Sequence, residues 1–99
     1  MPSRPDHYPR LTALALTFPT LRNPDLRGIA PFDVGSVARD LRSPAHTNAS
    51  RHAARFVLDV FNGGIAAGGK HFEVVSAMAS WDASHQRAFL AWAEAPWWG

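Results

Sequence analysis

The stretch GIAAGGK at residues 64–70 has the G-x-x-x-x-G-K spacing of a phosphate-binding loop. In such a loop, backbone N–H groups surround the phosphates, the lysine reaches the terminal ones, and a following Ser or Thr holds magnesium. Here the next residue is His71, so the magnesium ligand is missing, and the segment before the glycines has a helical pattern. We therefore interpret residues 63–70 as a Gly-rich linker and expect neither a nucleotide nor another cofactor.

Five histidines are the candidate metal ligands of the chain. They are His7, His46, His52, His71 and His85. No two have the i, i+3 or i, i+4 spacing that a metal site on one helix requires. His52 and His85 lie near the starts of two similar predicted helices and can still meet in space. Surface or capping roles are favoured, and we expect no metal.

Nucleophilic catalysis has little support in the sequence. Ser84 and His85 are adjacent, which gives no hydrogen-bonding geometry on a helix, and the chain has no cysteine and no G-x-S-x-G motif. Acid pairs such as Asp33 and Asp40 lie on the predicted solvent faces of short helices. We expect no catalytic residues and no enzyme activity.

Four arginines form the first candidate binding surface. Arg51 and Arg55 have i, i+4 spacing on one predicted helix, and Arg39 and Arg42 lie three apart on the helix before it. Across a helical hairpin, the four side chains are expected to form one exposed basic patch. Such a patch can meet nucleic-acid phosphates or an acidic protein surface.

The C-terminal EAPWWG is the second candidate surface. Pro96 ends the last predicted helix, so Trp97 and Trp98 should continue in an extended conformation with their side chains on roughly opposite sides. We expect one ring to dock on the helices and the other to remain exposed as a partner contact. Trp81 and Trp92 lie on apolar stripes and are predicted to be core residues.

Apolar spacing predicts the helices that must position these residues. The predicted helices cover residues 32–42, 48–62, 71–81 and 82–95. They form two hairpins, at 31–62 and 71–96, joined by the linker at 63–70. Asp82 is expected to cap the last helix, and Thr47, Asn48 or Ser50 the second. The sequence therefore predicts a mainly α protein, a small bundle of two helical hairpins.

The two hairpins resemble each other in sequence. FDVGSVARDL at 32–41 matches FEVVSAMASW at 72–81, and NASRHAARFVL at 48–58 resembles DASHQRAFLAW at 82–92. The pattern fits an internal repeat, in which the hairpins would superpose and pack alike. Chance similarity between amphipathic helices is the alternative.

The N-terminal third has weaker signals. Residues 1–10 contain three prolines and are expected to form an extended, poorly ordered arm. LTALALTF at 11–18 fits either a short helix or a packed extended segment, because so short a run does not reveal its period. Prolines at 19, 24 and 31 predict a connection with little regular structure.

Composition agrees with one globular domain. The chain has 99 residues, of which 46% are hydrophobic and 18% charged, with a net charge of +2. Residues 1–55 hold eight arginines against four acids, whereas residues 56–99 hold two basic residues against four acids. The absence of cysteine excludes disulfide scaffolds and thiolate metal sites. No apolar run reaches the ~20 residues of a membrane span, and we expect a cytoplasmic protein.

The segment WDASHQRAFLAWAEAPWW at 81–98 resembles the end of short, uncharacterised helical proteins found on plasmids and integrated elements of Gram-negative bacteria. The resemblance implies an accessory role in a mobile element or phage, such as inhibition of host defences, and brings no known activity or site. From the residues, we expect a non-enzymatic protein that binds another macromolecule, with a protein as the favoured partner. A nucleic-acid-binding regulatory module that uses the arginine face is the alternative, and the oligomeric state is left open.

Overall fold

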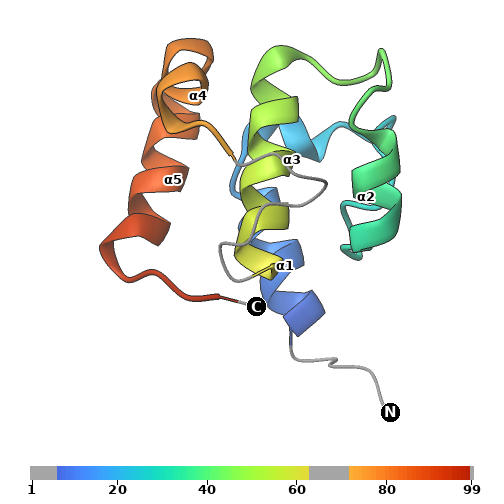
Figure 1. The fold of residues 1–99 in the computed structure, drawn as a ribbon, viewed down its shortest axis with the longest axis horizontal. Coiled ribbons are helices and arrows are strands. Elements are labelled where there is room, and N and C mark those ends of the chain that lie inside the picture. Colours follow the sequence, from blue (N-terminus) through green and yellow to red (C-terminus); the bar gives the residue numbers. More distant parts are fainter. Residues whose placement is uncertain (1–6, 63–71, 99) are drawn as a thin grey trace.

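The computed structural model describes residues 7–62 and 72–98 of the chain. Its elements are α1 (His7–Leu16), the 3-10 helix η1 (Pro19–Arg22), α2 (Val34–Asp40), α3 (Asn48–Phe61), α4 (Val74–Ser80) and α5 (Ala83–Glu94). No strand occurs in these two stretches. The predicted mainly α bundle is confirmed (Figure 1). The predicted linker at 63–70 lies outside the described residues.

Three helices begin at polar residues that cap their first turns. Asp33 accepts hydrogen bonds from two backbone N–H groups at the start of α2. Thr47 accepts from the backbone N–H of Ser50 at 3.1 Å, and Asp82 accepts from that of His85 at 3.0 Å. These bonds pair N–H groups that have no partner within the helix. Asp82 is thus confirmed as a cap, and Thr47 is the cap of α3.

Helix α3 is the centre of the bundle. In Figure 1 it stands between α2 on one side and α4 and α5 on the other, and α1 also packs against it. The predicted stripe of Ala53, Phe56, Val57 and Val60 is buried, and so is Leu58 outside that stripe. A helix covered on several sides buries more than one face, so burial here extends beyond what amphipathic spacing predicts.

The two hairpins are not packed alike, and the expectation of equivalent packing is wrong. In α3 seven residues are buried, whereas in α5 only His85 is buried. Helix α5 lies at the edge of the bundle (Figure 1). Its apolar side chains Ala88, Phe89 and Trp92 are only partly buried against the core. The caps differ too, because Asp33 bonds to its helix through its side chain and Glu73 does not. The similarity in sequence therefore predicts helices at matching places, not matching environments.

The N-terminal helix begins earlier than expected. Residues 7–10 belong to α1 and not to an extended arm, and residues 1–6 lie outside the described residues. Pro9 is tolerated because the first turn of a helix needs no N–H donors. The helical alternative for the LTALALTF run is confirmed as far as Leu16, and Leu11 and Phe18 are fully buried.

The connection from η1 to α2 has little regular structure, as predicted, yet it packs into the core. Its apolar residues Leu26, Ile29 and Phe32 are buried, as is Leu21 of η1. Gly28 turns the chain with a positive φ of 79°, and a Cβ there would lie 2.7 Å from the Cβ of Ser36. A side chain at this position would therefore be both strained and obstructed.

Candidate functional site

A solvent-open groove lies between α3, the start of α4, α5 and the C-terminal tail, and its volume is about 320 Å³. Its lining residues are Phe56, Asp59 and Val60 of α3, Phe72 and Val74, Phe89 and Trp92 of α5, and Trp98. Almost the whole lining is apolar, and Asp59 is the one charged residue in it.

Aromatic rings form the groove's frame. Phe56 is only 3% exposed and makes near-perpendicular contact with Trp92, with ring centroids 5.0 Å apart at 83°. Trp92 meets Trp98 in the same geometry, at 5.2 Å and 83°. Phe72 and Phe89 also contact Phe56, at 5.3 and 5.2 Å. Edge-to-face contacts of this kind are favourable and hold neighbouring rings at defined angles.

Asp59 positions the start of α4 at the edge of the groove. Its Oδ2 atom accepts a hydrogen bond from the backbone N–H of Phe72 at 2.8 Å. The bond joins the last turns of α3 to the segment that leads into α4. It also keeps the carboxylate beside the aromatic rings. Sequence reasoning missed this role, because the two residues are joined only once the chain has folded.

The tail separates its two tryptophans. The guanidinium carbon of Arg10 lies 4.0 Å from the centre of the Trp97 ring, and the indole N–H of Trp92 donates to the Trp97 carbonyl at 3.1 Å. Trp97 is half-buried against the core, while Trp98 is 52% exposed and lines the groove. Trp97 is thus the docked ring and Trp98 the exposed one. That Trp98 contacts a partner stays a prediction.

We expect the two tryptophans to respond differently to substitution. Trp97→Ala should lower the free energy of unfolding by about 1–3 kcal/mol, because it removes a partly buried ring and a cation–π contact. Trp98→Ala should change it by no more than about 0.5 kcal/mol. Urea denaturation followed by circular dichroism measures both. Equal destabilisation by the two variants would contradict this account of the tail.

The arginine face is not the single exposed surface that was expected. Arg39 and Arg42 are exposed, but Arg51 and Arg55 are half-buried. The Arg51 guanidinium donates to the carbonyl of Leu41 at 2.6 Å. It also donates to the carbonyls of His46 at 3.3 Å and Ser43 at 3.5 Å. Arg51 therefore holds the loop between α2 and α3, and this use competes with phosphate binding.

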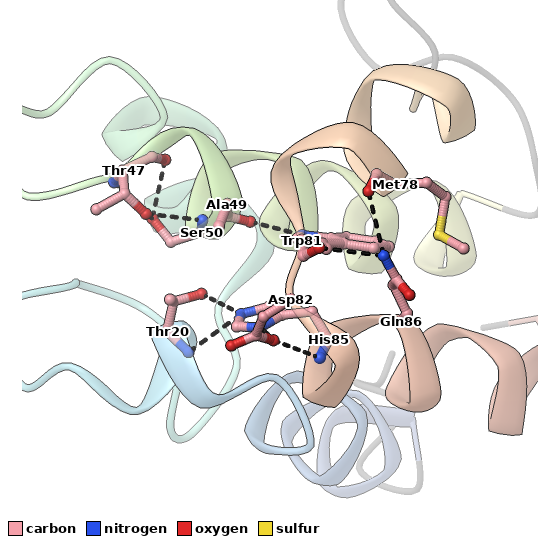
Figure 2. Close-up of polar contacts among 9 residues, drawn as sticks. All are labelled: Thr20, Thr47, Ala49, Ser50, Met78, Trp81, Asp82, His85 and Gln86. Carbon is pink, nitrogen blue, oxygen red and sulfur yellow. Dashed lines mark hydrogen bonds and ion pairs between the residues drawn. The ribbon is translucent and has the colours of Figure 1, made fainter.

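His85 joins distant parts of the chain (Figure 2). It is 2% exposed, and its two ring nitrogens lie 2.7 Å from Thr20 Oγ1 and 2.8 Å from Asp82 Oδ1. Hydrolytic triads have the same order of hydroxyl, imidazole and carboxylate. Here, however, Asp82 is a helix cap and the Thr20 backbone N–H also points at the ring, 3.4 Å away. We interpret the three residues as a tie between η1 and α5.

A more polar hollow of about 340 Å³ lies beside Thr20. It is lined by Pro19, Thr20, Arg22, Asn23, Ala45, Thr47 and Ser50. The hydroxyl of Thr20 bonds to His85, and those of Thr47 and Ser50 bond within the cap of α3. These groups are used by the fold, so the hollow offers less to a ligand than the aromatic groove does.

His52 and His85 are the two histidines for which the sequence left a contact open. The hydrogen bonds of the His85 ring go to Thr20 and Asp82, and not to His52. Within residues 7–62 and 72–98, no group of three His, Asp or Glu side chains could hold a metal ion. In the same stretches, no helix has the length and apolar character to cross a membrane.

Stability should depend on pH through His46 and His52. Burial lowers the pKa of His46, and burial together with the Arg55 charge lowers the pKa of His52, both from an ordinary value of 6.5. The unfolded chain therefore binds protons more readily, so stability is full above about pH 6.5 and falls as the pH drops through and below that value. Urea denaturation between pH 8 and about pH 5 should show this fall. An unchanged slope in the double variant His46→Gln, His52→Gln would contradict the assignment.

The comparisons with known proteins add no relative. No family model matches the chain, and neither the curated proteins nor the solved structures contain a significant match.

Proposed function

We propose that the protein acts without catalysis, by binding another protein through the aromatic groove. The observation that carries this proposal is an apolar hollow with Trp98 at its rim, 52% exposed. Large exposed aromatic side chains beside an apolar depression are typical of protein interfaces, where a few such residues supply most of the affinity.

The surroundings of the groove support the same proposal. Val74 of its lining is 43% exposed, Val75 beside it is 81% exposed, and Leu90 of α5 is 49% exposed. Val75 and Leu90 are therefore further exposed apolar side chains on the two helices that border the hollow. A partner helix or loop could cover them while one of its side chains enters the groove.

Nucleic-acid binding through the arginine face is less well supported. Arg51 is bound to the carbonyls of its own loop, which leaves Arg39 and Arg42 as the exposed members of the predicted patch. Two phosphate contacts would give only weak affinity, with a shallow dependence on salt concentration. We propose that the protein is cytoplasmic. Its role as a mobile-element or inhibitor protein is proposed only from the resemblance of residues 81–98.

The test is capture of partners with a matched pair of variants. Tagged protein is mixed with nuclease-treated lysate of a Gram-negative host, and bound proteins are quantified by mass spectrometry. We expect one partner to be held by the unaltered protein and by Arg39→Gln, Arg42→Gln. The same partner should be lost from Trp98→Ala, Val74→Ser by about 30-fold or more, the loss expected at an interface hot spot. Equal capture by both double variants would sink the proposal.

A further inference from the structure

Helix α5 contains a stretch that is apolar on all sides of the helix. The stretch is AFLAWA at residues 88–93, and its length exceeds one turn of about 3.6 residues. A helix that is apolar all round is normally buried all round. Helix α5 lies at the edge of the bundle instead, with Ala88, Phe89 and Trp92 packed against the core (Figure 1). Its outward side is exposed in the part of the chain that the structure describes.

Leu90 and Ala91 form the middle of this outward side. Leu90 is 49% exposed, and Ala91 is exposed as well. Successive residues of a helix are turned by about 100°, so these two lie on the side away from Phe89 and Trp92. A leucine held in water in the middle of an apolar stretch favours a contact that covers it.

Two unlike charges flank this pair at equal distances. Arg87 comes three residues before Leu90, and Glu94 comes three residues after Ala91. Because they are two helical turns apart, about 10 Å along the axis, both charges lie on the same outward side. Both residues are exposed. In residues 7–62 and 72–98, neither makes a side-chain hydrogen bond or an ion pair, so both charges are available to a partner.

This order of residues is complementary to itself when the helix is reversed. In an antiparallel pair of identical helices, the register that sets Leu90 of one copy against Ala91 of the other also sets Arg87 against Glu94. Two-fold symmetry makes each contact twice, so an ion pair closes each end of the apolar contact. Charges beside a helix–helix contact fix the orientation of the helices. A parallel pair in register would instead set like charges against each other, which is unfavourable.

We propose that the protein forms a two-fold symmetric dimer through the outward side of α5, with the two helices antiparallel. This contact goes beyond the proposed function, and none of its residues, Arg87, Leu90, Ala91 and Glu94, lines the aromatic groove. Leu90 is then covered by the second copy, and the groove is left to the protein partner. One pair of 12-residue helices buries less than the about 1,200 Å² of a standard interface, so the dimer is a weak one.

The oligomeric state of the full chain tests the dimer. Sedimentation equilibrium at low ionic strength, where exposed charges are least screened, should show monomer at about 10 μM and mainly dimer at about 1 mM. Leu90→Ser should weaken the association by about tenfold or more, because the apolar contact is lost twice. Val75→Ser, at a valine of α4 that is 81% exposed, should not weaken it. A monomer at every concentration overturns the dimer, and so does equal association of the two variants.

Charge reversal tests the antiparallel register. Arg87→Glu makes both flanking charges acidic, and Glu94→Arg makes both basic. Each variant alone should associate about tenfold more weakly or worse than the parent, because like charges then meet at both ends. An equimolar mixture of the two should form a heterodimer, since every end contact again joins opposite charges. A mixture that stays monomeric while the parent dimerises overturns the α5 contact, and circular dichroism checks that both variants are folded.

The dimer and the proposed function are tested separately. Trp98→Ala should dimerise like the parent, and loss of the dimer in this variant would place the contact at the groove and overturn the inference. Arg87→Glu should still capture the protein partner. Loss of that partner together with a monomeric parent would assign the outward side of α5 to the partner and overturn the dimer. A dimer without any groove-dependent partner contradicts the proposed function only, and a monomer with such a partner contradicts the dimer only.

Discussion

Trp81→Ala should lower the free energy of unfolding by about 3–5 kcal/mol, the cost of removing a large buried aromatic side chain. Trp81 is 4% exposed and joins the two halves of the bundle. Its ring contacts Phe18 at 5.2 Å and stacks on Phe72 at 5.6 Å. Its indole N–H donates to the carbonyl of Ala49 at 3.0 Å (Figure 2). Small domains have only about 5–15 kcal/mol in total, so this variant should be close to unfolding at physiological temperature.

Two controls separate loss of packing from a general effect of removing tryptophan. Trp81→Phe should be intermediate, since it retains most of the burial and loses the hydrogen bond to Ala49. Trp98→Ala should melt like the parent. Thermal and urea denaturation of the three variants would measure the order. A Trp81→Ala protein as stable as Trp98→Ala would contradict the central place given to Trp81.

Arg51→Lys should lower the free energy of unfolding by about 1.5–3 kcal/mol, although the charge is retained. The planar guanidinium donates to several loop acceptors at once, and an ammonium group cannot reproduce this geometry. The acceptors in the loop between α2 and α3 are the carbonyls of Leu41, Ser43 and His46. Loss of these bonds leaves carbonyl groups that water satisfies only in part.

Arg42→Lys is the matched control, because Arg42 is exposed in the same region. It should change the free energy of unfolding by no more than about 0.5 kcal/mol. Hydrogen exchange adds a local measurement, since amides of residues 41–47 should exchange faster in Arg51→Lys. If Arg51→Lys and Arg42→Lys are equally stable, Arg51 is not a structural residue. The arginine face would then regain its weight as a nucleic-acid surface.

Much of the local structure follows from the amino-acid sequence. Apolar spacing predicted the helices that lie within residues 34–61 and 74–94. Polar residues before the apolar stripes predicted the Asp82 cap and three candidates for the cap of α3, of which Thr47 is the one observed. Both signals are local, because a helix turn and its cap depend on residues within about four positions of each other. The docking of one C-terminal tryptophan and the exposure of the other also follow from an extended chain after Pro96.

Other features of the candidate site depend on contacts between distant residues. Sequence spacing predicts two equivalent hairpins. In the folded protein their packing differs: α3 lies at the centre of the core, and α5 lies at the edge with a groove beside it. Sequence spacing placed Arg51 on the surface, whereas its guanidinium donates to the Leu41 carbonyl at 2.6 Å and to two further loop carbonyls. The tie from Thr20 to His85 joins residues 65 positions apart.

The sequence by itself determined the four helices after residue 33, the Asp82 cap and the mainly α class of this protein, because those depend on neighbouring residues and on the period of the apolar pattern. The tertiary structure alone decided which helix is central, which tryptophan docks, and that five aromatic side chains and Asp59 share one groove. The physical reason is that burial and electrostatic complementarity are properties of surfaces brought together from separate segments. No spacing within a single segment records which surfaces will meet.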